Sequence, residues 1–275
     1  MTHDRSEPDQ LYLTLMKSVL TASIYEESAW SSLAMARSGW RKLLHGWLAR
    51  HALMLVKTRA MDHSARHEGR DWPMFGYTMA GHVRLDNVQF CVQTVLREGV
   101  AGDLIETGAW RGGTTIFMRA LLQAHGDRHR TVWVADSFEG LPPPKDKHDG
   151  WDYSRVDYLK ISLEQVQANF ERFGLLDGQV RFLKGWFADT LPTAPIDSLA
   201  VLRLDGDMYS STKDALDNLY HRVSLGGFVI VDDYHSWPAC RRAVDEFRQS
   251  HGISAPLQTV DWTATYWRVD VQSTR

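Results

Sequence analysis

The chain has 275 residues, of which 44% are hydrophobic and 24% charged, enough for one large α/β domain with an extension. Its formal net charge of −3 excludes the basic excess of a nucleic-acid-binding protein, and Cys91 and Cys240 form neither a disulfide framework nor a zinc pattern. With no apolar signal core in the first ten residues and no run of ~20 apolar residues, we expect a soluble, cytoplasmic protein without a membrane partner.

The first 70 residues are predicted to form a helical extension. Apolar residues recur at helical spacing over 11–25, and residues 30–60 continue the pattern with a Trp-rich apolar face and a basic polar face. Such a helix can lie on a membrane, but packing against the main domain or a second subunit is the commoner role, and we favour it. Residues 63–72 are charged and predict a loop. The Trp-rich segment favours a homodimer or a higher homo-oligomer.

Residues 71–275 are predicted to form the main domain. Strands are expected at 103–107, 131–135, 179–183, 198–204, 228–231, 257–261 and 265–269, and helices at 82–98, 114–125, 162–175, 213–223 and 237–250. This alternation indicates an α/β fold with a doubly wound, mostly parallel sheet, which a closing hairpin ends with an antiparallel strand. Ser210, Ser211 and Thr212 are placed to cap a helix. The Pro-, charge- and aromatic-rich segment at about 141–161 is too long for an ordinary connection and predicts a lid.

A glycine-containing turn, Glu106-Thr-Gly-Ala-Trp-Arg-Gly-Gly113, follows the first strand of this domain. Such a turn lets the backbone approach a ligand, although an ordinary strand-to-helix turn explains it equally well. Its glycine spacing is not the GxGxxG of a pyrophosphate cradle. Asp136 ends the next strand, where an acid can bind ribose hydroxyls or simply cap a turn. With Glu106 beside them, these features favour a nucleoside cofactor with a cationic tail, which S-adenosylmethionine fits better than NAD.

Four aspartates follow two apolar strands: Asp205 and Asp207 after the first, Asp232 and Asp233 after the second. Any one of them could merely cap a helix, but four carboxylates at neighbouring strand ends repel one another and favour a bound cation. Oxygen-only ligands suit Mg²⁺ or Ca²⁺. Asp207 is the candidate general base for deprotonating a hydroxyl beside that cation, and His235 is the rival.

Five segments together resemble the macrocin O-methyltransferase family, over roughly residues 70–270. They are Glu106-Thr-Gly-Ala-Trp-Arg-Gly-Gly113, Val134-Ala-Asp-Ser-Phe-Glu-Gly140, Gly185-Trp-Phe-Ala-Asp-Thr-Leu-Pro192, Leu204-Asp-Gly-Asp-Met-Tyr209 and Val231-Asp-Asp-Tyr234. Members of that family methylate deoxysugar hydroxyls on macrolide and aminocoumarin antibiotics. The resemblance implies a class I methyltransferase fold with a seven-stranded sheet, S-adenosylmethionine and Mg²⁺.

The resemblance also implies roles for individual residues. It matches Asp205, Asp232 and Asp233 to the metal ligands, and Asp207 to the general base. On the cofactor side it implies Glu106, Thr107, Gly108, Ala109 and Trp110 near the methionine part, Asp136, Ser137 and Phe138 near the ribose, Trp186 and Phe187 near the adenine, and Asp205 beside the donor. On the acceptor and lid side it implies Trp72, Tyr77, Met79, His148 and Tyr209.

We therefore interpret the chain as a Mg²⁺-dependent O-methyltransferase that acts on a deoxysugar hydroxyl of a glycosylated natural product. A catechol-type O-methyltransferase is the alternative, since a catechol would also place two oxygens at the ion. An NAD-binding oxidoreductase is a remote alternative, because GxGxxG is absent. A non-catalytic scaffold would have no need of Asp207. The sugar, the hydroxyl position and the aglycone stay open.

Overall fold

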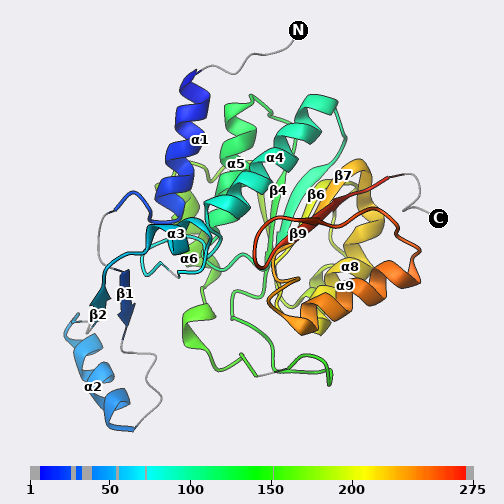
Figure 1. Ribbon diagram of the computed structural model, residues 1–275. Coiled ribbons are helices and arrows are strands. Elements are labelled where there is room, and N and C mark those ends of the chain that lie inside the picture. Colours follow the sequence, from blue (N-terminus) through cyan, green and yellow to red (C-terminus); the bar gives the residue numbers. More distant parts are fainter. Residues whose placement is uncertain are drawn as a thin grey trace.

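A seven-stranded sheet forms the centre of the molecule (Figure 1). The computed structural model describes residues 7–25, 29–32, 39–53, 56–71, 73–150 and 152–270. The strands are β3 (Asp103–Thr107), β4 (Val132–Asp136), β5 (Val180–Lys184), β6 (Leu199–Leu204), β7 (Val223–Val231), β8 (Gln258–Thr259) and β9 (Thr265–Arg268). Their order is β5-β4-β3-β6-β7-β9-β8, parallel except that β9 runs antiparallel to both neighbours. The predicted doubly wound sheet with a closing hairpin is confirmed.

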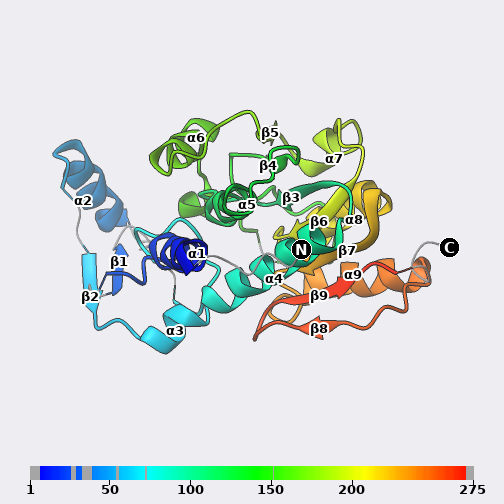
Figure 2. The same ribbon diagram turned by 90° about the horizontal axis from the view of Figure 1, so that it is seen from above.

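Helices cover both faces of the sheet (Figure 2). One face carries α1 (Glu7–Leu20), α4 (His82–Glu98), α5 (Gly113–Ala124) and α6 (Leu163–Arg172), and the other carries α7 (Phe187–Thr190), α8 (Tyr209–Leu219) and α9 (Pro238–Ser250). Two short 3₁₀ helices, η2 (Asp157–Leu159) and η3 (Tyr220–Arg222), complete the domain. Within the described residues, every helix is too short or too polar to span a lipid bilayer.

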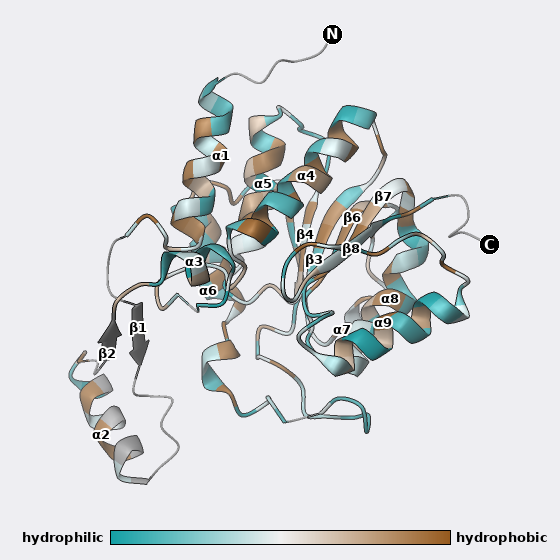
Figure 3. Cartoon of the chain, viewed as in Figure 1, coloured by the Kyte–Doolittle hydropathy of each residue, from teal (hydrophilic) through white to brown (hydrophobic). Residues whose placement is uncertain are grey.

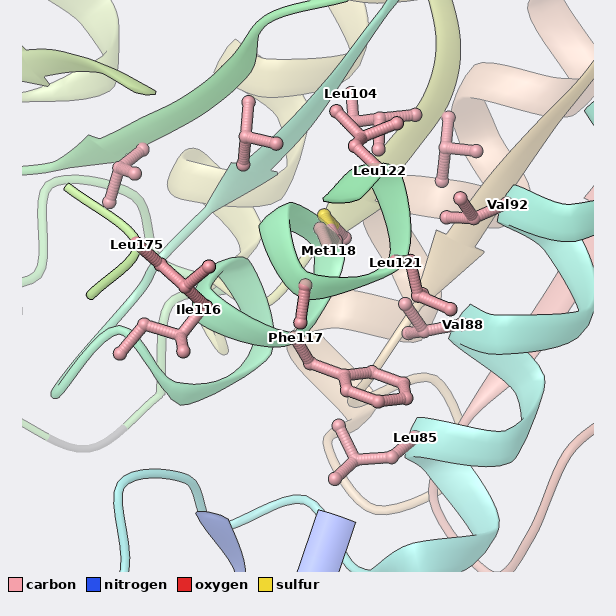
Figure 4. Packing of buried hydrophobic residues seen from close by; sticks show 14 of the residues in the cluster. Leu85, Val88, Val92, Leu104, Ile116, Phe117, Met118, Leu121, Leu122 and Leu175 are labelled. Atoms are coloured by element: carbon pink, nitrogen blue, oxygen red, sulfur yellow. The ribbon is translucent and has the colours of Figure 1, made fainter. Parts of the chain in front are cut away.

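The larger core lies between α4, α5 and the sheet (Figure 4). Leu85 and Val88 of α4 face Phe117 and Leu121 of α5, and all four side chains are at most 1% exposed. Full burial of an apolar side chain of this size contributes roughly 1.5–3 kcal/mol. This packing holds α5, and therefore the glycine turn before it, rigidly against β3.

The N-terminal region is more varied than the predicted helical extension. α1 packs on α5, with Leu13, Met16 and Leu20 buried in the same core. Residues 30–60 are not a single amphipathic helix, so that prediction is wrong: β1 (Ala29–Ser32) pairs antiparallel with β2 (Val56–Arg59) and α2 (Gly39–Arg50) lies between them. The β-branched Val56 and Thr58 favour a strand over a helix.

The segment β1–α2–β2, which we call the arm, projects from the domain (Figures 1 and 2). Apolar residues are visible along α2 in Figure 3. Trp40, Leu43 and Trp47 on that helix are 66%, 78% and 55% exposed. The predicted apolar face therefore exists, but only over the helix α2 itself.

Two shorter predictions also need correction. Residues 63–72 include a helix, α3 (His63–His67), because the Asp62 side chain accepts a hydrogen bond from Ala65 N at 3.0 Å and caps it. Helix α8 begins at Tyr209 instead of near residue 213, its N-cap position is Met208, and no side chain at that position caps it. The expected capping by Ser210, Ser211 or Thr212 is therefore wrong.

Candidate active site

A cavity of about 350 Å³ opens at the carboxyl edge of the sheet. The residues that follow β3, β4, β6 and β7 line it, together with the glycine turn and the lid, which is drawn in green below the sheet in Figure 1. In an open α/β sheet, ligands bind at this edge, where side chains from several strand ends converge. The cavity therefore brings together most of the residues that the sequence singled out.

Three of the four strand-end aspartates lie close enough to share one ion. Ligand oxygens of Asp205, Asp232 and Asp233 all lie within 4.8 Å of one another. Asp232 and Asp233 are buried, at 4% and 7% exposure, and Asp233 Oδ2 has no hydrogen-bond partner among the described residues. A buried, unpartnered carboxylate oxygen is costly unless a cation or a protonated group meets it.

Two buried arginines hold this acidic cluster together. Arg203 of β6 is 1% exposed and forms ion pairs with Glu106, with Asp232, and with Asp205 at 2.6 Å. From the opposite side, Arg84 of α4 forms ion pairs with Asp232 and, at 3.2 Å, with Asp261. Both guanidinium groups therefore contact Asp232 and fix the orientation of its carboxylate.

The sequence reasoning missed both arginines. Arg203 carried a signal, because a charged residue lies inside the otherwise apolar run Val201-Leu-Arg-Leu204. Such a residue on a fully buried strand requires a charged partner. Arg84 carried no comparable signal, since its partner Asp232 lies 148 positions away in the chain.

The protonation states in the cluster differ according to the cations nearby. Burial opposes ionisation of Asp232, but the charges of Arg203 and Arg84 outweigh it and lower the pKa of that carboxyl. Burial and the neighbouring Asp205 and Asp232 raise the pKa of Asp207 to about 8. Burial, followed by the charges of Asp207 and Asp205, raises the pKa of Asp233 well above its ordinary value. Ionising all of these carboxyls at once would therefore place more negative charge in the cluster than its two arginines compensate. A divalent cation would offset that charge and favour the ionised form of Asp207.

Asp207 lies in the turn between β6 and α8, in a left-handed backbone conformation with φ of 55°. It lines the cavity, and its charge adds to the burial that raises the pKa of Tyr153 and Tyr158 in the lid. The rival base, His235, is exposed and is not among the residues that line the cavity. The geometry therefore favours Asp207 over His235.

The glycine turn makes the close backbone approach that its sequence suggested. Gly108 has φ of 95°, and a Cβ atom there would lie 1.9 Å from the carbonyl oxygen of Asp205. Only glycine fits, because a side chain would collide with the backbone of the acidic cluster. The glycine turn and the acidic cluster are therefore in direct contact.

Asp136 organises the turns around it. Its Oδ2 accepts hydrogen bonds from Ala109 N at 2.7 Å and Trp110 N at 3.2 Å, and its Oδ1 accepts one from Phe138 N at 2.7 Å. Its Oδ1 also accepts a long hydrogen bond of 3.5 Å from Ser137 Oγ, but that hydroxyl has a single proton, which it donates at 2.7 Å to Gly140 O. Of the roughly four acceptor sites of a carboxylate, the fourth is therefore only weakly occupied and can accept a ligand hydroxyl. Asp136 lines the cavity, so a ribose could still reach it.

Glu106, the last residue but one of β3, is a buried residue that lines the cavity. One oxygen, Oε1, pairs with Arg203, whereas Oε2 is buried with no hydrogen-bond partner among the described residues. Burial raises the pKa of Glu106 to about 8, even though the charge of Arg203 opposes the shift. An unpaired carboxylate oxygen beside a cavity is a suitable acceptor for a ligand ammonium group.

The other predicted site residues divide into two groups. The cavity lining includes Met79, Ala109, Trp110, Ser137, Trp186 and Phe187. It does not include Thr107, Phe138, Tyr77, His148 or Tyr209. Tyr77 packs its ring on Phe173, with centroids 5.0 Å apart, and His148 lies against Tyr209 at 5.4 Å. Trp72 lies outside the described residues.

Comparisons with known proteins agree on one kind of enzyme. The model of the Macrocin-O-methyltransferase (TylF) family matches residues 9–269. The 8-demethyl-8-(2,3-dimethoxy-alpha-L-rhamnosyl)-tetracenomycin-C 4'-O-methyltransferase of Streptomyces olivaceus is 50% identical, over 100% of this chain and 97% of that protein. The demethyldecarbamoylnovobiocin O-methyltransferase of Streptomyces niveus is 46% identical, over 96% and 95%. The solved structure of the O-methyltransferase NovP matches with a TM-score of 0.82 at 46% identity, over 95% of this chain and 99% of that one.

These matches extend further than the predicted resemblance, which began near residue 70. The family match begins at residue 9 and therefore includes α1 and the arm. The family model therefore includes the N-terminal region as well as the methyltransferase domain.

Proposed function

Because the chain belongs to the macrocin O-methyltransferase (TylF) family and is an O-methyltransferase, we propose that it methylates a deoxysugar hydroxyl of a glycosylated natural product. The name of the Streptomyces olivaceus relative, which describes 4'-O-methylation of a rhamnosyl tetracenomycin, supports a sugar acceptor. The observation that carries this proposal is the trio Asp205, Asp232 and Asp233 beside Asp207 and the glycine turn.

The methyl donor in this proposal is S-adenosylmethionine, and the cavity fits it. Glu106 Oε2 would accept a hydrogen bond from the donor's ammonium group, since it has no partner of its own among the described residues. Gly108 would let the methionine part lie against the backbone, Asp136 and Ser137 would meet the ribose, and Trp186 and Phe187 would pack on the adenine. When bound, S-adenosylmethionine supplies an electrophilic methyl group.

The metal in this proposal is Mg²⁺, held by Asp205, Asp232 and Asp233. Three carboxylates with oxygens within 4.8 Å of one another suit a hard cation. Among the described residues, this cluster contains no histidine or cysteine, the ligands that would favour zinc. The unpartnered Oδ2 of Asp233 supports the fit. When bound, Mg²⁺ lowers the pKa of a hydroxyl group beside it.

Asp207 acts as the general base in this scheme. Its carboxylate would accept the proton of the acceptor hydroxyl, and the residues around the cavity would hold that hydroxyl towards the donor. Arg203 and Arg84 keep Asp232 ionised and oriented throughout, because both guanidinium groups contact it. Tyr153 and Tyr158 cover the site from the lid side and exclude water.

The acceptor would bind against the aromatic residues that line the cavity, which include Tyr153, Tyr158, Trp237 and Trp262. Aromatic walls with a few polar groups are typical of sites for a ring-shaped ligand. A catechol could stack on the same walls, so it is the alternative acceptor class.

An acceptor screen tests the proposal. Desmethyl glycosides and simple catechols are offered with S-adenosylmethionine carrying a labelled methyl group, and the label on each product is counted. We expect label on the sugar oxygen of a glycoside. Transfer to catechols alone would replace the sugar assignment with the catechol one, and failure of both classes would contradict it.

We also propose an oligomeric state, a domain division and a location in the cell. A homodimer or higher oligomer is supported by the exposed Trp40, Leu43 and Trp47 of the arm. A division near residue 70 into an N-terminal region and a methyltransferase domain, and a cytoplasmic location, rest on the sequence. Light scattering of the purified protein would test the first.

A further inference from the structure

One carboxylate of the lid is buried. Asp149 is 3% exposed, whereas Lys147 and Gly150 near it are exposed. Its Oδ2 accepts hydrogen bonds from Lys145 N and Asp146 N, both at 2.8 Å. Its Oδ1 accepts one from Ser210 N, also at 2.8 Å. The side chain of Asp149 therefore joins the lid to helix α8, 61 positions further along the chain.

Helix α8 lacks a cap of its own. Its N-cap residue is Met208, whose side chain makes no capping hydrogen bond. The first backbone N–H groups of a helix have no partner within the helix and need an acceptor from elsewhere. Asp149 supplies that acceptor for Ser210, and a carboxylate at this end of a helix also meets the favourable end of the helix dipole.

The capped end of α8 directly follows the proposed base. Asp207 lies two residues before the first residue of α8, in a left-handed conformation with φ of 55°. A non-glycine residue in that conformation costs of order 1–3 kcal/mol and persists only where its surroundings impose it. The first turn of α8 is one of those surroundings.

The lid also contacts the glycine turn and the segment just before α9. Trp110 Nε1 donates a hydrogen bond to Tyr158 O at 2.9 Å. The ring of Tyr153 meets that of Trp237 edge-on, with centroids 5.1 Å apart. Burial alone would raise the pKa of Asp149. The hydrogen bonds from the N–H groups of Asp146, Ser210 and Lys145 outweigh this effect, so the pKa lies below its ordinary value. Asp149 is therefore held ionised at a point where the lid meets the first turn of α8, directly after the turn that carries Asp207.

We propose that Asp149 is a positioning residue that couples seating of the lid to the conformation of the Asp207 turn. When the lid is seated, Asp149 caps α8 and holds the first turn in place, so Asp207 points into the cavity. When the lid lifts, Ser210 N loses its acceptor and the turn loosens. The proposal rests on the proposed role of Asp207 as the base.

The test compares Asp149→Ala with Asp149→Asn and with the control Asp146→Ala in the full-length enzyme. Asp146 accepts a side-chain hydrogen bond from His148 N, inside the lid, and makes no such bond to α8. Backbone hydrogen exchange is measured over residues 207–213, and kcat and the KM of the acceptor are measured separately. Asp149→Asn retains one acceptor oxygen, so it provides a second variant if Asp149→Ala folds poorly.

We expect Asp149→Ala to accelerate exchange at the start of α8 by roughly 10- to 100-fold, the size of a hydrogen bond to a charged group. We also expect kcat to fall by about tenfold at saturating acceptor, with Asp149→Asn intermediate and Asp146→Ala within about twofold of the wild type. If the lid only covered the acceptor, Asp149→Ala would raise the KM of the acceptor and leave kcat unchanged.

Unchanged exchange at the start of α8, or a raised KM with normal kcat, would overturn the proposal. Failure of the base assignment is seen separately. If Asp207→Asn keeps full turnover, Asp207 is not the base, whatever the exchange of Asp149→Ala shows.

Discussion

Replacing Arg203 with methionine would remove the cation at the centre of the acidic cluster. The side chain is 1% exposed and pairs with Glu106 and Asp232, which are also buried, and with the partly exposed Asp205. Removing one partner of a buried ion pair costs about 3–5 kcal/mol, because the remaining charge is left uncompensated. Against a total stability of about 5–15 kcal/mol, that is a large fraction.

Thermal unfolding measures this loss. At roughly 2–4 °C per kcal/mol for a large domain, Arg203→Met should lower Tm by about 6–20 °C. Added Mg²⁺ should raise the Tm of the variant more than that of the wild type, because the ion supplies part of the missing positive charge. Lys213→Met is the matched control: Lys213 pairs with Asp217 on the surface of α8, and its loss should cost at most about 0.5 kcal/mol. An Arg203→Met variant that melts within about 2 °C of the wild type would refute the reasoning.

Three more substitutions test other parts of the site. Asp207→Asn should lower kcat by about 10²- to 10⁴-fold, which is the usual contribution of a general base. Binding of Mn²⁺, measured by electron paramagnetic resonance, should stay intact. Near-normal turnover would show that Asp207 is not the base. Gly108→Ala should abolish S-adenosylmethionine binding in calorimetry, since its Cβ would lie 1.9 Å from Asp205 O, and wild-type affinity would contradict the close approach. Trp110→Phe keeps an aromatic ring but loses the indole N–H that donates a hydrogen bond to Tyr158 O, so proteolysis within the lid should accelerate by about fivefold. An unchanged cleavage rate would count against that hydrogen bond as an anchor of the lid.

The central sheet could be predicted from the sequence because its signals are local. Alternating apolar runs and helical patterns located β3 to β9, and α4 begins and ends at the predicted His82 and Glu98. The strand-end aspartates were also readable, since parallel strands bring their carboxyl ends to one edge. Patterns confined to a dozen residues were therefore sufficient for the fold.

The features that could not be predicted depend on residues far apart in the chain. Arg84 reaches Asp232 across 148 positions, and Asp149 caps α8 across 61, so neither pairing leaves a local pattern. The start of α8 was misplaced for the same reason, because its cap comes from the lid. The arm was misread because its amphipathic spacing is real over α2 but does not extend into the strands that flank it.

The most direct test is the metal dependence of methyl transfer to a desmethyl glycoside. The enzyme is treated with EDTA, assayed with labelled S-adenosylmethionine, and assayed again after Mg²⁺ is restored. We predict that transfer to the sugar falls to background in EDTA and returns with Mg²⁺, and that Asp232→Asn does not recover. Transfer at the same rate in EDTA would contradict a site in which Asp205, Asp232 and Asp233 hold a catalytic ion.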